Sequence, residues 1–158
     1  MTELKCRFCN ANLEDTFADL GFSPIANDNL SKEDLLKMER FYPLHVYVCK
    51  SCMLVQLPEH QSPEEIFNSD YAYFSSYSDS WVEHARKYVE MMIGRFNFNK
   101  NSQVIEIASN DGYLLQHFKK NNVPVLGIEP SANCAEAAEK IGIRSLVKFF
   151  GVNTANEL

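Results

Sequence analysis

Four cysteines have the type and spacing of a metal site. They form two pairs, Cys6 with Cys9 and Cys49 with Cys52, and each pair has two residues between its members. A two-residue gap lets the chain turn so that both thiolates face one ion, and two such turns complete a tetrahedral four-thiolate zinc site. The long segment between the pairs is tolerable because loop-closure cost grows only logarithmically with length. The pattern therefore predicts a structural zinc site.

Other roles for paired cysteines fit this sequence less well. Disulfides are typical of exported chains, and no basic segment followed by an apolar one opens the sequence. A thioredoxin-like redox pair normally opens a helix, whereas Cys49–Cys52 lies between two expected strands. Chance spacing stays open as an alternative. We interpret Cys134 as a core residue, and we expect neither His45 nor His60 to bind the metal, because two complete pairs leave no open position.

A second group of polar residues follows two predicted parallel strands. Residues 104–108 form a short apolar run, as expected for a strand covered on both faces. Its single acid, Glu106, is costly to bury unless it meets hydrogen-bond donors. The polar turn 109–112 follows, and the next strand, 123–128, ends at Glu129, where a carboxylate can accept hydrogen bonds from ribose hydroxyls. This pattern predicts a nucleotide-type site at the carboxyl edge of a sheet.

The composition of the turn favours a cationic ligand. Ala108 and Asn110 stand where a dinucleotide-binding turn would carry glycines, and neither G-x-G-x-x-G nor a P-loop is present. An acidic turn with Asp111 is a poor cradle for pyrophosphate but suits a sulfonium nucleoside. We therefore expect S-adenosylmethionine rather than NAD. The alternative is an ordinary α/β turn beside a surface Glu129.

The elements that position these groups predict an α/β fold in three segments. Residues 1–61 are expected to form a zinc-ribbon-like module, and residues 62–101 to connect it through helices and a tyrosine-rich loop. Residues 102–158 show the order β-α-β-α-β, which predicts an incomplete Rossmann-like sheet with right-handed crossovers.

Several local elements are expected within these segments. In the first, we predict a helix from Ser31 through Arg40 and a hairpin of strands at 44–48 and 53–57. In the second, Ser62 and Ser80 are each expected to cap a helix, since a Glu follows three residues later. In the third segment we predict helices at 114–122 and 132–141 and a third strand at 143–147. We expect residues 149–151 to close this strand.

Charge and hydropathy limit the partners. The formal net charge is −6 and the predicted pI is about 5.2. Proteins that bind nucleic acid gain affinity from clustered Lys and Arg, so nucleic acid is not an expected partner. The sequence shows no apolar stretch of membrane-spanning length. We expect a cytoplasmic protein without a membrane partner.

Taken together, these motifs resemble the sugar C-methyltransferases that act on nucleotide-linked deoxysugars. Such enzymes have an N-terminal zinc-binding domain followed by a class I S-adenosylmethionine-dependent methyltransferase domain. No single motif is decisive, but their order is specific and they cover nearly the whole chain. The matching segments are Cys6-x-x-Cys9, 19–27, 48–57, 71–76, Glu106–Gly112 and Gly127–Ser131.

The resemblance implies particular site residues. Cofactor contacts are expected from the turn and from the end of the second strand, at Glu106, Ala108, Ser109, Asn110, Asp111, Gly112, Glu129 and Pro130. Substrate contacts are expected from the tyrosine-rich stretch, at Tyr71, Tyr73, Ser75 and Ser76, with Tyr73 the best candidate. One departure is local: family members usually carry Gly where this chain has Ala108, and the extra methyl could crowd the cofactor.

The larger departure is length, because 46 residues follow Gly112, too few for the seven-stranded sheet of such enzymes. In the family, later parts supply the Tyr/Glu/His group that removes a proton beside the sugar's keto group before the enolate attacks the methyl carbon. No residue here is assigned a catalytic role. We expect the N-terminal part of such an enzyme, inactive alone and prone to self-association through its sheet edge. The alternative is a zinc-binding remnant or interaction module without catalysis.

Overall fold

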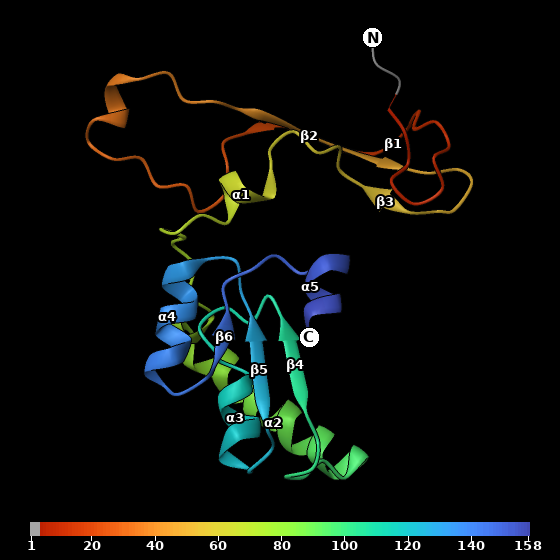
Figure 1. Ribbon diagram of the computed structural model, residues 1–158. Coiled ribbons are helices and arrows are strands. Elements are labelled where there is room, and N and C mark those ends of the chain that lie inside the picture. Colours follow the sequence, from red (N-terminus) through yellow and green to blue (C-terminus); the bar gives the residue numbers. More distant parts are fainter. Residues whose placement is uncertain (1–3) are drawn as a thin grey trace. The chain divides into compact units, whose positions relative to one another are not determined.

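The computed structural model describes residues 4–158, which fold into two compact units (Figure 1). The first unit ends at Ile66 and the second spans Phe67–Leu158, so the predicted connecting segment 62–101 is divided between them. The first unit contains an antiparallel sheet and the second a parallel sheet with helices. The mixed α/β class predicted from the sequence is confirmed. No helix within the described residues is long and apolar enough to cross a membrane.

The sheet of the first unit has the strand order β1-β2-β3. These strands are β1 (Asp15–Ser23), β2 (Tyr42–Val48) and β3 (Val55–Gln56), all antiparallel to their neighbours. The predicted hairpin of β2 and β3 is confirmed. Strand β1 was not expected, because two irregularities in its pairing break the alternation of its side chains. Its large apolar side chains Phe17, Leu20 and Phe22 are all exposed.

The helix expected from Ser31 through Arg40 is absent. This part of the chain forms only one 3₁₀ turn, η1 (Asp34–Leu36). The capping chemistry at Ser31 is present, since its Oγ accepts the Asp34 N–H at 3.2 Å. A short helix depends on packing an apolar face, but Leu36 and Met38 are about nine-tenths exposed. The turn therefore does not continue as a helix.

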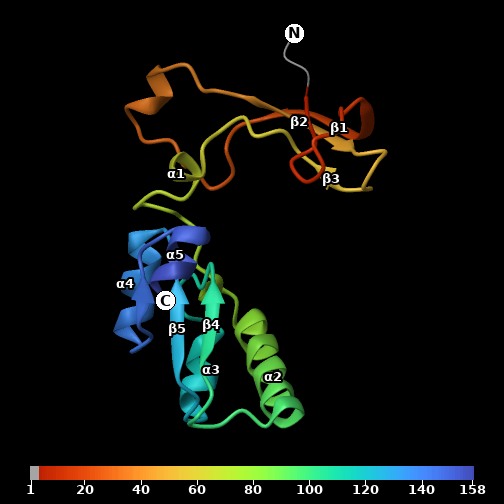
Figure 2. The same ribbon diagram turned by 45° about the vertical axis from the view of Figure 1, so that its right-hand side comes forward.

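The second unit is built on three parallel strands in the order β4-β5-β6, all labelled in Figure 1. Figure 2 shows β4 and β5 side by side from a second direction. The three strands are β4 (Val104–Ile107), β5 (Val125–Ile128) and β6 (Ser145–Leu146). Helices α3 (Leu115–Lys120) and α4 (Ala132–Lys140) connect them, as the sequence predicted. Strand β6 ends at Leu146, so residues 149–151 lie beyond it and do not close it. A short helix that was not predicted, α5 (Val152–Glu157), follows.

Two further helices precede the parallel sheet. Helix α1 (Pro63–Ile66) begins with the predicted capping box, in which Ser62 and Glu65 each accept the other's N–H, at 3.3 and 3.2 Å. Helix α2 (Asp79–Phe96) is capped by Ser78, whose Oγ accepts the Trp81 N–H at 3.3 Å. The expected cap at Ser80 is therefore wrong by two residues.

The core of the second unit joins α2 and α3 to the sheet. Its buried residues are Val89, Leu115, Phe118, Val123, Ala138 and Ile143. Gly112 lies against this core at φ +79°, where a Cβ would stand 3.1 Å from Ile143 Cγ1 and 3.3 Å from the Ala138 Cβ. The left-handed conformation favours glycine, and the close contact leaves little room for a Cβ. The turn after β4 is thereby packed onto the second crossover.

Candidate functional site

The four paired cysteines meet in one cluster of the first unit. Their Sγ atoms all lie within 4.8 Å of one another. The Cys6–Cys52 and Cys9–Cys49 sulfur distances are 3.6 and 3.5 Å. Tetrahedral zinc with Zn–S bonds of about 2.3 Å requires sulfurs about 3.8 Å apart. The cluster therefore fits a four-thiolate zinc ion closely, as the spacing predicted.

The two cysteine turns have the same backbone design. The Asn10 N–H donates to the Cys6 carbonyl at 2.9 Å, and the Met53 N–H donates to the Cys49 carbonyl at 2.8 Å. Asn10 and Met53 both adopt left-handed backbone conformations, with φ of 60° and 62°. These hydrogen bonds fold each pair so that its two thiols point the same way. All four cysteines are free thiols.

The two histidines near the cluster are used elsewhere or exposed. His45 Nε2 lies 2.7 Å from Thr16 Oγ1, and its ring stacks on Tyr47 with centroids 4.3 Å apart. His60 is exposed and is not part of the cluster. Among the residues described, the cysteines alone form a group of metal-ligand type. A site with four thiolates has no open position and serves structure rather than catalysis.

Gln56 supports the cluster from outside. Its Nε2 donates to Cys6 Sγ at 3.2 Å, while its Oε1 accepts the Arg7 N–H at 3.0 Å. The Gln56 side chain is buried. Partners of this kind orient metal ligands and hold their charge. Sequence reasoning included Gln56 in a matching segment but gave it no role, since its contact is 50 positions away in the chain.

We predict that Gln56→Ala weakens zinc binding by roughly 10- to 100-fold, because the Cys6 thiolate loses its donor and the first turn loses an anchor. The purified wild-type protein should carry about one zinc per chain. Competition with a chromogenic chelator measures the affinity, and Gln61→Ala serves as a control outside the cluster. Wild-type protein without zinc, or equal affinity in Gln56→Ala, would contradict this account.

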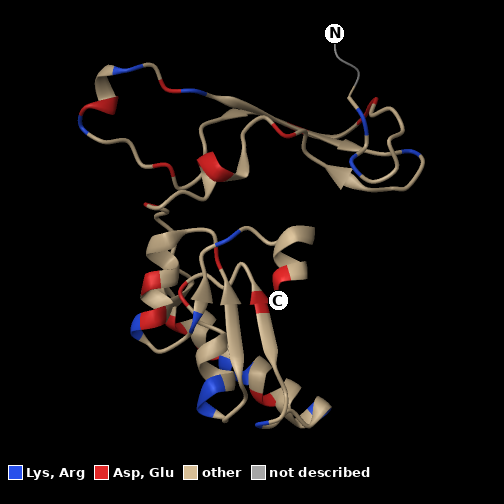
Figure 3. Cartoon of the chain, in the orientation of Figure 1, with Lys and Arg blue, Asp and Glu red and all other residues tan. Residues whose placement is uncertain are grey.

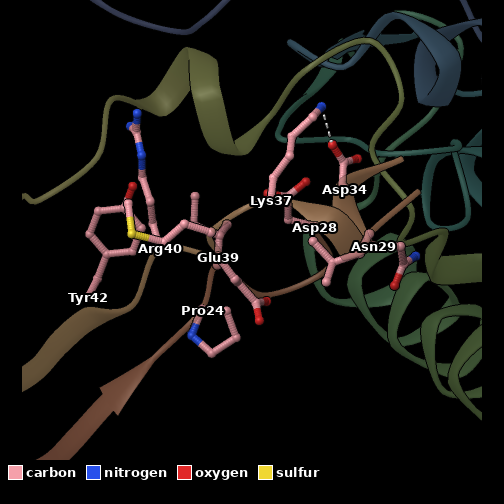
Figure 4. Close-up of a pocket in the computed structure, with 11 residues that line it drawn as sticks. Pro24, Asp28, Asn29, Asp34, Lys37, Glu39, Arg40 and Tyr42 are labelled. Atoms are coloured by element: carbon pink, nitrogen blue, oxygen red, sulfur yellow. Dashed lines mark hydrogen bonds and ion pairs between the residues drawn. The ribbon is translucent and has the colours of Figure 1, made fainter. Parts of the chain in front are cut away.

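The first unit also contains a hollow of about 290 Å³ in the segment between β1 and β2 (Figure 4). Charged side chains line it, but Lys37 Nζ is paired with Asp34 Oδ1 at 2.8 Å. This lysine and the Ser31 hydroxyl lower the pKa of Asp34 to about 2. Lys, Arg, Asp and Glu are interspersed along this unit (Figure 3). The Lys37 and Asp34 charges are thus satisfied locally.

A pocket of about 400 Å³ lies in the second unit at the carboxyl ends of β4 and β5. It brings together seven of the residues expected to bind cofactor or substrate, namely Ala108, Asn110, Glu129, Pro130, Tyr71, Tyr73 and Ser75. Six other lining residues were not among the predicted contacts: Phe67, Ile107, Ile128, Lys148, Phe149 and Phe150. The last three follow β6, so the rule that ligands bind beyond the carboxyl ends of parallel strands could have found them.

Glu129 joins two walls of this pocket. Its Oε2 accepts the Asn110 N–H and its Oε1 accepts the Ser131 N–H, both at 2.8 Å. The side chain is buried, with 4% of its surface exposed. The carboxylate thus connects the turn after β4 to the start of α4. Each oxygen keeps a second lone pair, so Glu129 can still accept a hydrogen bond from a ligand.

The remaining predicted residues lie beside the pocket and do not line it. Ser109 is fully buried, and Gly112 packs on the core. Asp111 uses Oδ2 to accept the Ser76 N–H at 3.0 Å, and its buried Oδ1 has no partner within the described residues. The expectation that these residues touch a ligand stays a prediction.

Glu106 does not line this pocket but lines a second hollow of about 480 Å³. Side chains of α2 and α3 line this hollow together with β4. Glu106 Oε2 is buried without a hydrogen-bond partner in the described part of the chain. Burial, reinforced by the charges of Asp111 and Glu129, raises the pKa of Glu106 to about 8. Within the described residues, no neighbour donates to Glu106 Oε2 the hydrogen bond that would favour its ionised form.

We predict that Glu106→Gln stabilises the protein increasingly as pH rises from about 5 to 8. In the folded state Glu106 keeps its proton up to a pKa of about 8, whereas the unfolded chain releases it near 4.5. The wild type therefore loses stability across this window, and glutamine removes the loss. Since one pKa unit equals about 1.4 kcal/mol, the gain at pH 8 should be roughly 2 to 4 kcal/mol.

Urea unfolding of both proteins at several pH values, with zinc present, measures this difference. Glu136→Gln, on the exposed side of α4, is the matched control and should show a small difference that does not depend on pH. A constant gap between wild type and Glu106→Gln would contradict the assignment.

Comparisons with known proteins agree with this architecture. Residues 6–67 match the profile of a family described as "Putative zinc binding domain". Over 154 residues the chain is 29% identical to the C-methyltransferase NovU of Streptomyces niveus. That alignment covers 98% of this chain and 36% of the relative, so the chain spans about a third of the relative's length.

These findings confirm the resemblance stated from the motifs. Residues 6–67 are similar to that zinc-binding family, and the chain is distantly related to a C-methyltransferase. The cysteine cluster lies within the matched domain. The pocket at the edge of the parallel sheet lies in the segment that the alignment with the relative also covers.

Proposed function

We propose that this chain forms the zinc-stabilised part and the cofactor-binding sheet edge of an S-adenosylmethionine-dependent C-methyltransferase. Its substrate would be a nucleotide-linked deoxy-ketosugar. One observation carries the proposal: a pocket with a buried acid, Glu129, stands at the carboxyl edge of a parallel sheet in a chain related to a C-methyltransferase. In α/β proteins this edge is where nucleotides bind.

The residues present fit an adenosyl ligand. A pocket of about 400 Å³ is within the range of small-molecule sites. Ile128, Phe149 and Phe150 offer apolar walls for a purine, and Glu129 offers free lone pairs for ribose hydroxyls. When bound, S-adenosylmethionine supplies an electrophilic methyl group on a sulfonium. The class I methyltransferase fold is part of this proposal.

The charges around the pocket favour a cationic ligand. Asp111 Oδ1 is buried and has no partner among residues 4–158, and Glu129 carries a carboxylate at the pocket wall. The one lysine of the lining, Lys148, is paired with Glu157. A positive sulfonium would therefore meet a net negative environment, whereas a pyrophosphate would meet unfavourable charge.

The tyrosine-rich segment supports a role in substrate contact. Tyr73 lines the pocket and is half exposed, so its phenol is accessible to a bound molecule. Tyr71 and Ser75 also line the pocket. Ser76 lies beside them, and its N–H donates a hydrogen bond to Asp111 Oδ2. We assign these residues to binding and orientation, and we assign no residue of this chain as the base that removes the sugar proton.

The test of this proposal uses ligand analogues, because Glu129→Ala would also release the two backbone groups that Glu129 holds. Calorimetry should show binding of S-adenosylhomocysteine, and an analogue without ribose hydroxyls should bind about 10- to 100-fold more weakly, since hydrogen bonds to charged groups are strong. In Glu129→Gln, which keeps the size of the side chain, this difference should shrink.

NAD is the control ligand for this experiment and should not compete with S-adenosylhomocysteine. A zinc-loaded, folded wild-type protein that binds no adenosyl ligand would contradict the proposal and favour a non-catalytic zinc-binding module. Equal affinity for both analogues would remove Glu129 from ribose recognition.

A further inference from the structure

The segment from Tyr71 to Ser76 is held against the pocket through its main chain. The Asn110 side chain makes two of the contacts: Oδ1 accepts the Ser75 N–H at 2.8 Å, and Nδ2 donates to the Tyr73 carbonyl at 3.1 Å. Asp111 Oδ2 accepts the Ser76 N–H at 3.0 Å. Asn133 Nδ2 donates to the Tyr71 carbonyl at 2.8 Å. These contacts span 35 to 62 positions of the chain.

Asn110 is suited to this task in both its backbone and its side chain. Its φ of 50° lies in the left-handed region, which asparagine tolerates better than most residues. Its side chain is buried, and one amide supplies the acceptor for Ser75 and the donor for Tyr73 at the same time. Aspartate has no donor for the carbonyl. The two hydrogen bonds together therefore require an amide side chain at position 110.

Asn110 also stands directly between the pocket acid and the tyrosines. Its own N–H donates to Glu129 Oε2, and its side chain continues to the backbone on both sides of Phe74. Tyr73 and Ser75, which Asn110 fixes by their main chain, both line the pocket. A ligand that contacts Glu129 is therefore connected to these residues through a single side chain.

We propose that Asn110 is a positioning residue that couples the adenosyl pocket to the tyrosine-rich segment. This inference rests on the proposed function for the identity of the ligand, but the clamp itself does not require a ligand. Asn110 holds Tyr73 and Ser75 at the pocket wall, so that cofactor-side and substrate-side contacts form together. Binding of the ligand in the pocket then orders the tyrosine-rich segment. By the same coupling, loosening this segment weakens ligand binding.

Hydrogen exchange tests the clamp in the ligand-free protein. The N–H groups of Ser75 and Ser76 donate to side chains that follow β4, so their exchange rates report on the clamp. In Asn110→Gly, which tolerates the left-handed backbone, a peptide covering residues 73–77 should exchange at least about tenfold faster. Asn122→Gly is the matched control, since Asn122 also has a φ of 59° but lies outside the pocket. Unchanged exchange in Asn110→Gly would overturn the clamp.

The coupling is tested by adding S-adenosylhomocysteine to the same proteins. In the wild type and in Asn122→Gly the ligand should slow exchange in residues 73–77. In Asn110→Gly the ligand should bind about tenfold more weakly and should no longer slow this exchange. Equal slowing in Asn110→Gly and wild type would overturn the coupling, because a merely structural role of Asn110 would leave it intact.

Asn110→Asp keeps the size of the side chain, the left-handed preference and the acceptor for Ser75, and it serves if Asn110→Gly fails to fold. It places a carboxylate against the Tyr73 carbonyl, so ligand affinity should fall in protein that circular dichroism shows to be folded. Wild-type affinity in this variant would overturn the coupling. A wild type that binds no ligand would reject both the proposed function and the coupling, whereas faster ligand-free exchange in Asn110→Gly would still establish the clamp.

Discussion

The second unit depends on one buried carboxylate. Glu129 accepts main-chain N–H groups from Asn110 and from Ser131, and so it ties the end of β4 to the beginning of α4 across the end of β5. Both N–H groups lie in turns, where no neighbouring strand accepts their hydrogen bonds. Leaving them buried without an acceptor would be costly. With Gly112 packed on Ile143 and Ala138, this interaction fixes the shape of the sheet edge. The tyrosine-rich segment is connected to it through Asn110.

The first unit depends on the cysteine cluster in a comparable way. Its buried cluster consists of Cys6, Cys49 and Leu13, with few other apolar side chains packed against them. Phe17, Leu20 and Phe22 are exposed on β1 and do not contribute to it. A segment with so little buried apolar surface gains much of its folding free energy from the metal. A zinc ion held by the four cysteines would therefore take the place of a hydrophobic core in this unit.

Local patterns predicted much of this structure, and long-range contacts account for most of what they missed. The apolar runs predicted β4 and β5, and the spacing of the cysteines predicted their cluster, because both signals are carried by neighbouring residues. The prediction of a helix from Ser31 through Arg40 was wrong, because the apolar side chains of this segment have no surface to pack against. The roles of Asn110 and Gln56 were missed because their partners are 35 or more positions away. Strand spacing indicated which residues approach the pocket, but it could not show that Glu129 is already bound to two backbone groups.

The central claim is that the sheet edge around Glu129 binds an adenosyl ligand. Backbone amide shifts in an NMR titration of the zinc-loaded protein with S-adenosylhomocysteine test it most directly, because the amides of Asn110 and Ser131 report on Glu129 itself. The account predicts saturable shifts concentrated at residues 108–111, 129–131 and 148–150. Shifts confined to the unit that ends at Ile66, or no shifts at a saturating ligand concentration, would contradict it.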